Sequence, residues 1–360
     1  MAERPVLLVT GQVPPDRVGA MRALHEAEGI EIAIYDGRLH HATPGVEDPG
    51  VPFRRVSQRG VAALAAAGGH RAVIATSAGR IALPAAYWGA RRAGVPFLYW
   101  TGIWSQLTTP AHLAAIPLVR HIERRADAVI AYGPHVADYV RSHGAKNVHV
   151  APQPVDVGFW SAAADGPAAR ARAGDPPLLA LFAGRDAPGK GVPELLAAWR
   201  RTRIAADGGI LALAGPPAAS GAGVMALGPL EPADLRNFFA AADVVVVPSV
   251  PTRSFREPWG LVVNEAMLQR TCVIATDAVG AAAGGLVSGG ETGVVVPAGD
   301  PAALAAAIDA LAGDPGRRTA LAAAGARAAL AYDFAACAAG VSEALASVGQ
   351  ARKTPAPGGR

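Results

Sequence analysis

Cysteine and aromatic residues are scarce in this sequence. Its 360 residues include two cysteines, Cys272 and Cys337, and aromatic side chains make up 6% of the total. Two thiols form no disulfide framework, and without a C-x-x-C pair they suggest no zinc site. So few aromatic side chains argue against an aromatic-rich β-sandwich, whereas 51% apolar residues exclude a disordered chain. The length is sufficient for two domains of ordinary size.

Signals for secretion and membrane insertion are also missing. The N-terminus has no basic region followed by a long apolar run, so we expect no signal peptide. The longest stretch without a formal charge, 93–119, is long enough to span a bilayer but contains Pro96, Pro110 and Pro117. Because a spanning helix accommodates these prolines poorly, we expect a cytoplasmic protein with no transmembrane segment.

Three ligand-binding patterns are absent from the sequence. No G-x-G-x-x-G follows the apolar run at 6–9, which weighs against a dinucleotide oxidoreductase. The Walker A pattern G-x-x-x-x-G-K-[ST] is not matched, and no Asp-x-Asp pair is available to hold a divalent ion. We therefore expect no metal and no bound cofactor.

Positive charge is concentrated in the first part of the chain. Residues 1–155 contain 16 Lys and Arg against 11 Asp and Glu, a net charge of +5, and the remainder carries −1. The sequence contains no dense stripe of basic residues, so we expect no nucleic-acid binding. The excess fits either an ordinary solvated surface or one that meets an anionic acceptor or the inner face of a membrane.

Short apolar runs alternate with longer helix-like segments along most of the chain. Continuous apolar runs indicate strands of parallel sheets covered on both faces, which predicts the α/β class with two doubly wound domains. The runs are 6–9, 30–35, 72–75, 96–100, 128–131, 148–151, 178–183, 210–214, 244–247, 272–276 and 293–296. In such folds ligands bind at the carboxyl ends of the strands, and we expect the site in a cleft between the domains.

The composition changes between the two sets of strands and again near the end. Pro, Gly and Ala dominate 156–177, which we interpret as a linker between an N-terminal domain, 1–155, and a C-terminal domain, 178–332. Residues 333–349 predict a C-terminal helix that crosses back to the N-terminal domain, and 350–360 a flexible tail.

Two segments of the second domain combine glycine, charge and a helix start. In 184–191 a glycine leaves a strand, Arg185 and Lys190 follow, and a helix begins, which suits a polyanion. The alternative is an ordinary strand–turn–helix with solvated cations. In 256–267 the carboxylates of Glu257 and Glu265 flank Gly260, where a second helix begins. The alternative is that an acid in the first turn stabilises the helix dipole, which would account for one of these glutamates but not for both.

Together these segments resemble the GT-B-fold retaining glycosyltransferases of the family 4 type. The blocks 184–191, 248–267 and 273–300 carry the resemblance by their order and spacing, and the likeness of 1–155 is looser. The resemblance implies two Rossmann-like domains and a hexosyltransferase that uses a nucleotide-diphosphate sugar. Arg185 and Lys190 would hold the diphosphate and stabilise leaving-group charge, and Glu257 would contact hydroxyls of the donor sugar.

The resemblance also implies a donor-binding set. Its members are Gly184, Gly228, Leu230, Gly260, Leu261 and Glu265. Gly260 and Leu261 would offer N–H groups to the diphosphate, Glu265 would bind the ribose, and the turn 227–230 would hold the base through the backbone. In this family a donor phosphate oxygen takes the acceptor proton, so we assign Glu257 to positioning and not to nucleophilic attack.

On the acceptor side the candidates are Gly19, Thr101, Trp104 and His135. Gly19 would approach the phosphates and acceptor, whereas Thr101 stands near the place where many relatives have a histidine. His135 is a candidate for the site, with helix capping as the alternative. Tyr99, Trp100, Trp104 and Leu107 could form an aromatic acceptor platform or belong to the core.

Three functions compete for this sequence. The first is transfer of a sugar to a hydroxyl of a glycan, glycolipid or small natural product. The second is a nucleotide-sugar epimerase or hydrolase on the same fold, and the third is a catalytically silent nucleotide-sugar-binding module. Intact Arg185, Lys190, Glu257 and Glu265 argue against the third.

Overall fold

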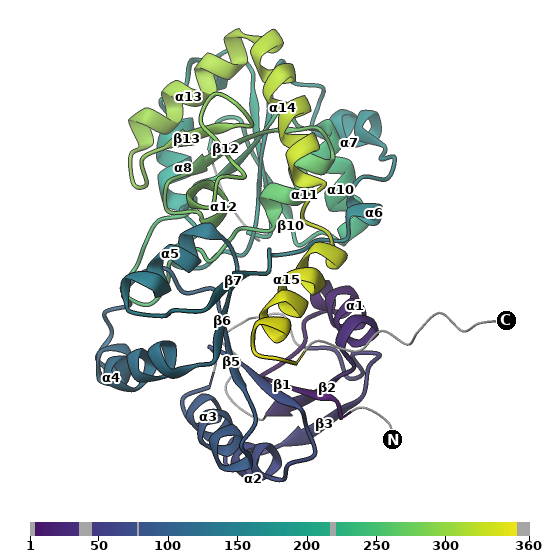
Figure 1. The fold of residues 1–360 in the computed structure, drawn as a ribbon. Coiled ribbons are helices and arrows are strands. Elements are labelled where there is room, and N and C mark those ends of the chain that lie inside the picture. The colour runs from purple at the N-terminus through teal and green to yellow at the C-terminus, as the bar shows by residue number, and fades with distance from the viewer. Residues whose placement is uncertain (1–3, 36–44, 78, 217–220, 351–360) are drawn as a thin grey trace, which may run out of the picture. The chain divides into compact units, whose positions relative to one another are not determined.

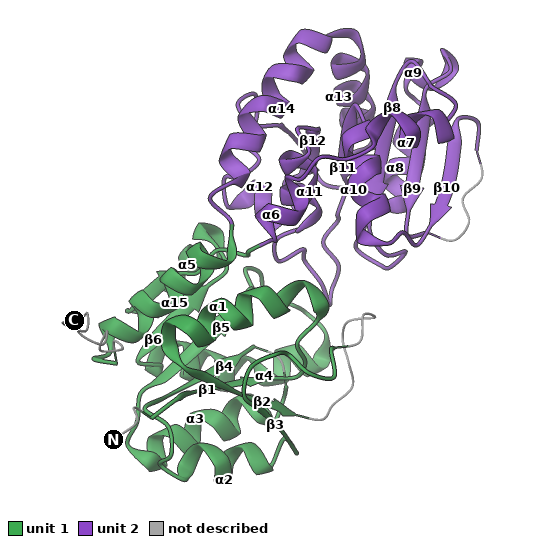
Figure 2. Ribbon diagram, turned by 90° about the vertical axis from the view of Figure 1, so that its right-hand side faces the viewer, with its two compact units in different colours: residues 1–154, 333–360 green, residues 155–332 purple. Residues whose placement is uncertain are grey.

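Two α/β units make up the chain. The computed structural model describes residues 4–35, 45–77, 79–216 and 221–350. Unit 1 contains residues 1–154 and 333–360, and unit 2 is the uninterrupted segment 155–332 (Figures 1 and 2). Each unit is a parallel β-sheet with helices on both faces, which confirms the predicted fold class.

Unit 1 has a seven-stranded sheet with the order β3-β2-β1-β4-β5-β6-β7, and all its pairings are parallel. Its strands are β1 (Val6–Thr10), β2 (Ile30–Tyr35), β3 (Phe53–Val56), β4 (Ala72–Thr76), β5 (Phe97–Thr101), β6 (Ala128–Ala131) and β7 (Val148–Val150). Its helices are η1 (Pro15–Arg17), α1 (Val18–Glu28), α2 (Gly60–Ala66), α3 (Ala82–Ala93), α4 (Pro110–Arg125), α5 (Pro134–Ser142) and α15 (Phe334–Ser347). The continuous apolar strands are buried between two helical layers.

Unit 2 has a six-stranded parallel sheet with the order β10-β9-β8-β11-β12-β13. Its strands are β8 (Leu179–Ala183), β9 (Ile210–Ala214), β10 (Val224–Gly228), β11 (Val244–Val247), β12 (Cys272–Thr276) and β13 (Val294–Val296). Its helices are α6 (Val157–Trp160), α7 (Gly166–Arg172), α8 (Val192–Trp199), α9 (Arg203–Ala206), α10 (Pro232–Ala241), α11 (Val262–Leu268), α12 (Gly280–Ala283), α13 (Pro301–Gly313) and α14 (Pro315–Ala329). The strand order reverses between β8 and β11, where doubly wound sheets bind ligands.

The sequence analysis missed one strand in each sheet, β3 and β10. Both are edge strands. Arg54 and Arg55 in the middle of β3 are exposed, and β10 has no fully buried residue. An edge strand is half solvated and needs no continuous apolar run, so the pattern that identifies central strands fails at both positions.

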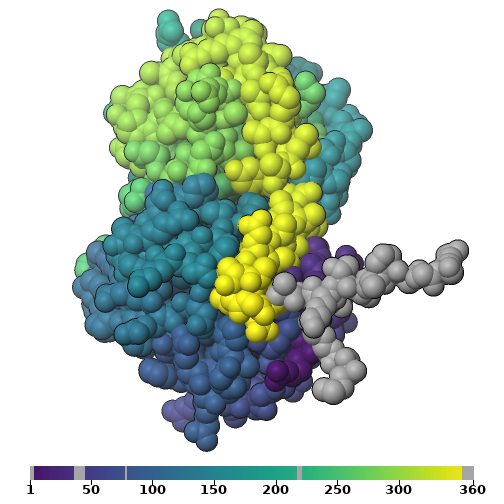
Figure 3. All heavy atoms as spheres, in the orientation of Figure 1, coloured from purple at the N-terminus to yellow at the C-terminus, as the bar shows by residue number. Residues whose placement is uncertain are grey.

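The segments next to the unit boundaries are helical. Residues 156–177, expected to be a linker, form α6 and α7 within unit 2, where α7 packs against α10. Asp156 and Asp165 cap these two helices by accepting hydrogen bonds from Phe159 N and Ala168 N. Helix α15 lies in unit 1 against α1, and it is the yellow helix on the surface of that unit in Figure 3. The predicted tail from 351 onward lies outside the described residues.

Hydropathy alone identifies no single spanning helix among the described residues. Helices α14 and α15 meet the length and composition test only as a bent pair.

Candidate functional site

The predicted donor-site residues of unit 2 follow the carboxyl ends of neighbouring strands. The loop 184–191 follows β8, the loop 248–261 follows β11, and Gly228 ends β10. Because the strands are parallel, these loops share one edge of the sheet. The sequence-predicted donor residues of unit 2 are therefore brought to one place by the topology.

Glycine allows the loops after β8 and β11 to touch. Gly191 has a φ of +74°, and a Cβ at this position would lie 1.8 Å from Pro248 O. Val250 N donates a hydrogen bond of 2.9 Å to Gly189 O, which joins the same two loops. A side chain at Gly191 would separate them.

The ammonium of Lys190 and the carboxylate of Glu257 form an ion pair in this contact. Lys190 Nζ lies 2.6 Å from Glu257 Oε2, and the ammonium also lies over the ring of Phe255, 5.5 Å from its centroid. Glu257 is only 7% exposed, so the pair is largely shielded from water. The two residues predicted to hold the diphosphate and the sugar are thus direct partners.

Two residues that the sequence analysis did not assign hold this carboxylate in place. Ser249 Oγ donates to Glu257 Oε2 at 3.2 Å, and Thr276 Oγ1 donates to Ser249 O at 2.5 Å. Ser249 and Thr276 are both buried. Ser249 could have been found from the sequence, because it directly follows an apolar strand. Thr276 could not, because its contribution depends on the pairing of β11 with β12.

The remaining residues predicted to bind the donor lie at the start of helix α11. Gly260 has a φ of +89°, Leu261 precedes the first helical residue, and Glu265 lies one turn into the helix, as predicted. Trp259 Nε1 donates to the buried Asn264 Oδ1 at 2.7 Å, which anchors the loop to α11. Gly280 N donates to Glu257 O at 3.1 Å, so β12 and its following loop support the backbone of the same glutamate.

Two arginines add positive charge to this edge of the sheet. The exposed Arg185 directly follows Gly184 at the start of the loop after β8. Burial lowers the pKa of the Arg256 guanidinium, and the nearby Asp277 carboxylate opposes that shift. Arg256 adjoins the predicted Glu257 but was not itself selected from the sequence.

The turn predicted to bind the base, 227–230, is formed by close backbone contacts. Gly215 N donates to Gly228 O at 2.7 Å, and a Cβ on Gly215 would lie 1.9 Å from Gly184 O. Gly228 has a φ of +67°, and Leu230 packs against the core of unit 2. The turn therefore lies beside the start of the 184–191 loop.

The acceptor-side candidates lie in unit 1. Thr101 is buried at the end of β5 and accepts a 3.1 Å hydrogen bond from Ile103 N. Trp104 and His135 contact each other edge to face, with ring centroids 5.0 Å apart. Gly19 packs against α15, because a Cβ there would lie 2.1 Å from the ring of Phe334. Close helix packing thus accounts for this glycine.

Tyr99 and Trp100 do not form a common platform. They are consecutive residues of β5, so their side chains point to opposite faces of the sheet and belong to different core clusters. Both are buried. These two residues therefore belong to the hydrophobic core and not to an acceptor platform.

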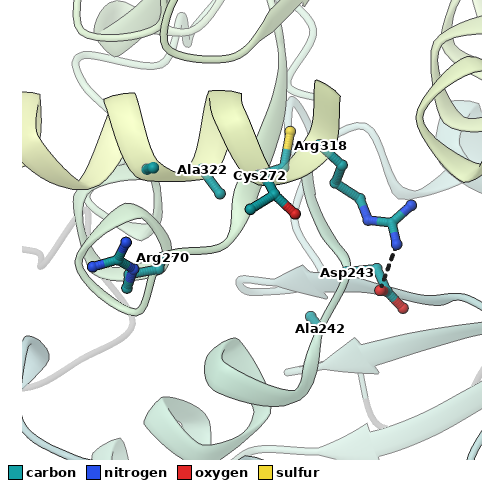
Figure 4. A pocket seen from close by; sticks show the side chains of 8 residues that line it. Ala242, Asp243, Arg270, Cys272, Arg318 and Ala322 are labelled. Atoms are coloured by element: carbon teal, nitrogen blue, oxygen red, sulfur yellow. Dashed lines mark hydrogen bonds and ion pairs between the residues drawn. The ribbon is translucent and has the colours of Figure 1, made fainter. Parts of the chain in front are cut away.

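A cavity of about 200 Å³ lies at the opposite ends of β11 and β12. Asp243, Arg270, Cys272 and Arg318 are among its lining residues, and Figure 4 shows the Arg318–Asp243 ion pair. Asp243 also pairs with Arg170 and accepts from Leu179 N, so its contacts join α7, α14 and the sheet. Burial raises the pKa of the Cys272 thiol to about 11, which keeps it protonated.

Sequence comparison relates the site-bearing unit to a known family. Residues 177–314 match the family model of glycosyl transferases group 1. A D-inositol 3-phosphate glycosyltransferase of Kineococcus radiotolerans is 34% identical over 233 residues, which cover 53% of this chain and 49% of that protein. The chain thus spans about half of the length of such curated relatives.

Comparison with solved structures extends over both units and supports the GT-B fold. The Anabaena HepE protein in complex with UDP superposes with a TM-score of 0.76 at 20% identity, covering 95% of this chain and 100% of that one. Sucrose-phosphate synthase from Thermosynechococcus elongatus gives 0.72 at 22% identity, with 95% and 98% covered.

Proposed function

We propose that this chain, whose residues 177–314 match the group 1 glycosyl transferases, is a member of that family and moves a sugar from a nucleotide diphosphate to a hydroxyl acceptor. The observation that carries the proposal is the Lys190–Glu257 pair beside Gly191 at the strand ends of the family-matched unit. This pair places a cation and a buried carboxylate at the edge where doubly wound sheets bind nucleotides.

In the proposed reaction the cations act on the leaving group. Lys190, oriented by Glu257, and Arg185 at the start of the same loop would offset the charge that develops on the diphosphate as the glycosidic bond breaks. The N–H groups of Gly260 and Leu261 would add hydrogen bonds to the diphosphate, and Glu265 would accept from the ribose diol. These cations suit catalysis without a divalent ion, so activity should survive EDTA.

We further propose that the transfer retains the anomeric configuration. The bond from the anomeric carbon to the phosphate oxygen breaks, the bond to the acceptor oxygen forms on the same face, and the acceptor proton goes to a donor phosphate oxygen. Glu257 is engaged by Lys190 and Ser249, which supports a positioning role for it over that of a nucleophile. Proton NMR of the first-formed product tests this, because an inverted anomer would contradict it.

Uridine is the first base to test, because the Anabaena protein is in complex with UDP and, in a second structure, with UDP-glucose. The acceptor that we propose is a hydroxyl compound with an anionic group. The net charge of +5 in residues 1–155 suits such a molecule, and the curated relatives are named for D-inositol 3-phosphate.

The deciding experiment is a thermal-shift panel of UDP, GDP, ADP and TDP in EDTA. A nucleotide at 100 times its Kd should add about 2.7 kcal/mol to the free energy of unfolding. The shift should vanish in Arg185→Ala and persist in Arg200→Ala, which removes an exposed arginine from the end of α8. If no nucleotide raises Tm, the binding and catalytic proposals both fail.

Product analysis with the donor alone then separates the competing reactions. A transferase should turn over rapidly only when an acceptor is added. Rapid release of free sugar or an epimerised donor would indicate the hydrolase or epimerase, and binding without turnover on any acceptor would indicate a silent module.

A further inference from the structure

Exposed apolar side chains cluster on two helices of unit 1. Among the described residues, six large hydrophobic side chains are exposed, and four of them belong to α3, to the residue before it, or to α4. These four are Ile81, Trp88, Leu113 and Leu118, and we call this surface the α3–α4 face. Single exposed hydrophobic residues are ordinary, but such a concentration on neighbouring elements marks an interaction surface.

The geometry of the helices brings three of these side chains, Ile81, Trp88 and Leu118, to one side of the α3–α4 pair. Ile81 and Trp88 are seven residues apart, so they lie two turns apart on the same side of α3. Trp88 stacks on His121 of α4 at 6.1 Å between ring centroids, which fixes α3 beside α4 (Figure 1). Leu118 is one turn from His121 and therefore lies on the same side of α4. The first ten residues of α4, 110–119, contain no Asp, Glu, Lys or Arg.

Positive charge surrounds this apolar surface. Residues 49–122 contain no Asp or Glu and eight arginines. The exposed arginines of α3, α4 and the preceding turn are Arg80, Arg91, Arg92, Arg124 and Arg125. The nearby acids are already engaged, since Glu123 is buried against Arg120 and Asp127 pairs with Arg91.

We propose that the α3–α4 face binds the surface of an anionic lipid bilayer. Trp88 and the leucines would enter the boundary between headgroups and acyl chains, and the arginines would contact lipid phosphates. A second copy of the same face is a poor partner, because a two-fold interface would bring arginines against arginines. This surface is remote in sequence from the loops that we propose to bind the donor. The membrane proposal is therefore tested independently of the catalytic proposal.

The test is co-sedimentation of the full chain with vesicles. Equimolar phosphatidylcholine and phosphatidylglycerol should bind the chain, pure phosphatidylcholine should bind it weakly, and salt should reduce the binding. The double variant Trp88→Ser, Leu118→Ser should lose about tenfold or more in affinity. Leu330→Ser is the matched control, because Leu330 in unit 2 is 53% exposed and Trp88 is 55% exposed. Arg80→Gln, Arg92→Gln should weaken binding to the anionic vesicles only.

Fluorescence gives a readout that does not depend on a disruptive variant. Lipids with brominated acyl chains should quench emission of the parent chain and leave Trp88→Phe largely unquenched. The proposal is overturned if the parent does not bind anionic vesicles or if the double serine variant binds like the parent. It is also overturned if the parent is a dimer in size-exclusion chromatography that the double variant dissociates, with no affinity for vesicles.

Discussion

The Glu257 carboxylate illustrates how single residues are positioned in unit 2. Lys190 and Ser249 both donate to its Oε2 atom, and Thr276 fixes the backbone carbonyl of Ser249. Three side chains, from the loop after β8, the loop after β11 and the end of β12, therefore position one charged group. Removal of the Lys190 ammonium should reduce the stabilisation of the transition state more than the stability of the fold, because Ser249 still donates to the Glu257 carboxylate.

Lys190→Ala should reduce kcat/KM by about 100-fold or more, since it removes a cation aimed at the leaving group. The free energy of unfolding should fall by only about 2 kcal/mol, the typical value for a hydrogen bond to a charged group. Steady-state kinetics and urea unfolding measure the two effects. Lys146→Ala, at an exposed lysine of unit 1, is the control and should change neither quantity. A Lys190→Ala enzyme as active as the parent would remove Lys190 from the mechanism.

Alkaline pH should destabilise the protein through its two buried thiols. Burial raises the pKa of Cys272 to about 11 and that of Cys337 to about 12. Between the thiol pKa of the unfolded chain, about 8.5, and these folded values, the unfolded state binds fewer protons, so the free energy of unfolding falls as pH rises. Urea unfolding from pH 8 to 10.5 measures this slope, about pH 8.5 being the expected onset. The double variant Cys272→Ala, Cys337→Ala should show a shallower slope, and an equal slope would refute the assignment.

At the scale of elements, glycines decide how closely the loops approach each other. Gly191, Gly215 and Gly280 each face a backbone carbonyl oxygen that a Cβ would approach within 2.0 Å. The contacts join the loops that follow β8, β9, β11 and β12. Close backbone contacts that only glycine allows therefore hold these loops together.

Gly191→Ala should destabilise unit 2 by about 3 kcal/mol, because the left-handed backbone and the clash with Pro248 O act together. Nucleotide binding should be lost in the same variant. Gly174→Ala is the matched control, with a similar φ of +82° and open space around its Cβ, and should cost about 1 kcal/mol. Chemical unfolding and the thermal-shift panel provide the two measurements. Equal effects of both substitutions would show that strain alone, and not the loop contact, matters.

At the scale of the whole molecule, the last helix completes the first unit. Helix α15 contributes Cys337, Val341, Ala344 and Leu345 to the buried core of unit 1. Asn147 Nδ2 also donates to Ser347 Oγ at 2.8 Å. Unit 2, in contrast, is one uninterrupted segment with its own core. The two units should therefore respond differently to truncation.

Ending the chain after Tyr332 should unfold or strongly destabilise unit 1, because it exposes the apolar surface that α15 covers. Unit 2 should be unaffected, and the fragment 155–332 should fold and keep its affinity for nucleotide. Differential scanning calorimetry of the truncated chain and of the fragment tests this. A truncated chain that keeps every transition of the parent would contradict the role of α15.

The class of the fold could be predicted from the sequence alone, and so could the places of the loops that we propose to bind the donor. Central strands are buried on both faces and so are continuous apolar runs, and Gly184, Lys190, Gly260 and Glu265 stand at fixed places after them. The edge strands β3 and β10 were not predicted, because they are partly exposed to solvent and are not continuous apolar runs.

Which of these residues are partners depends on the tertiary structure. Lys190 and Glu257 are 67 residues apart, and their ion pair depends on the adjacency of β8 and β11 in the sheet. Thr276 joins them through Ser249 because β12 pairs with β11. Local pattern carries information about burial and turns, whereas contacts between distant loops follow from strand order, which no single segment encodes.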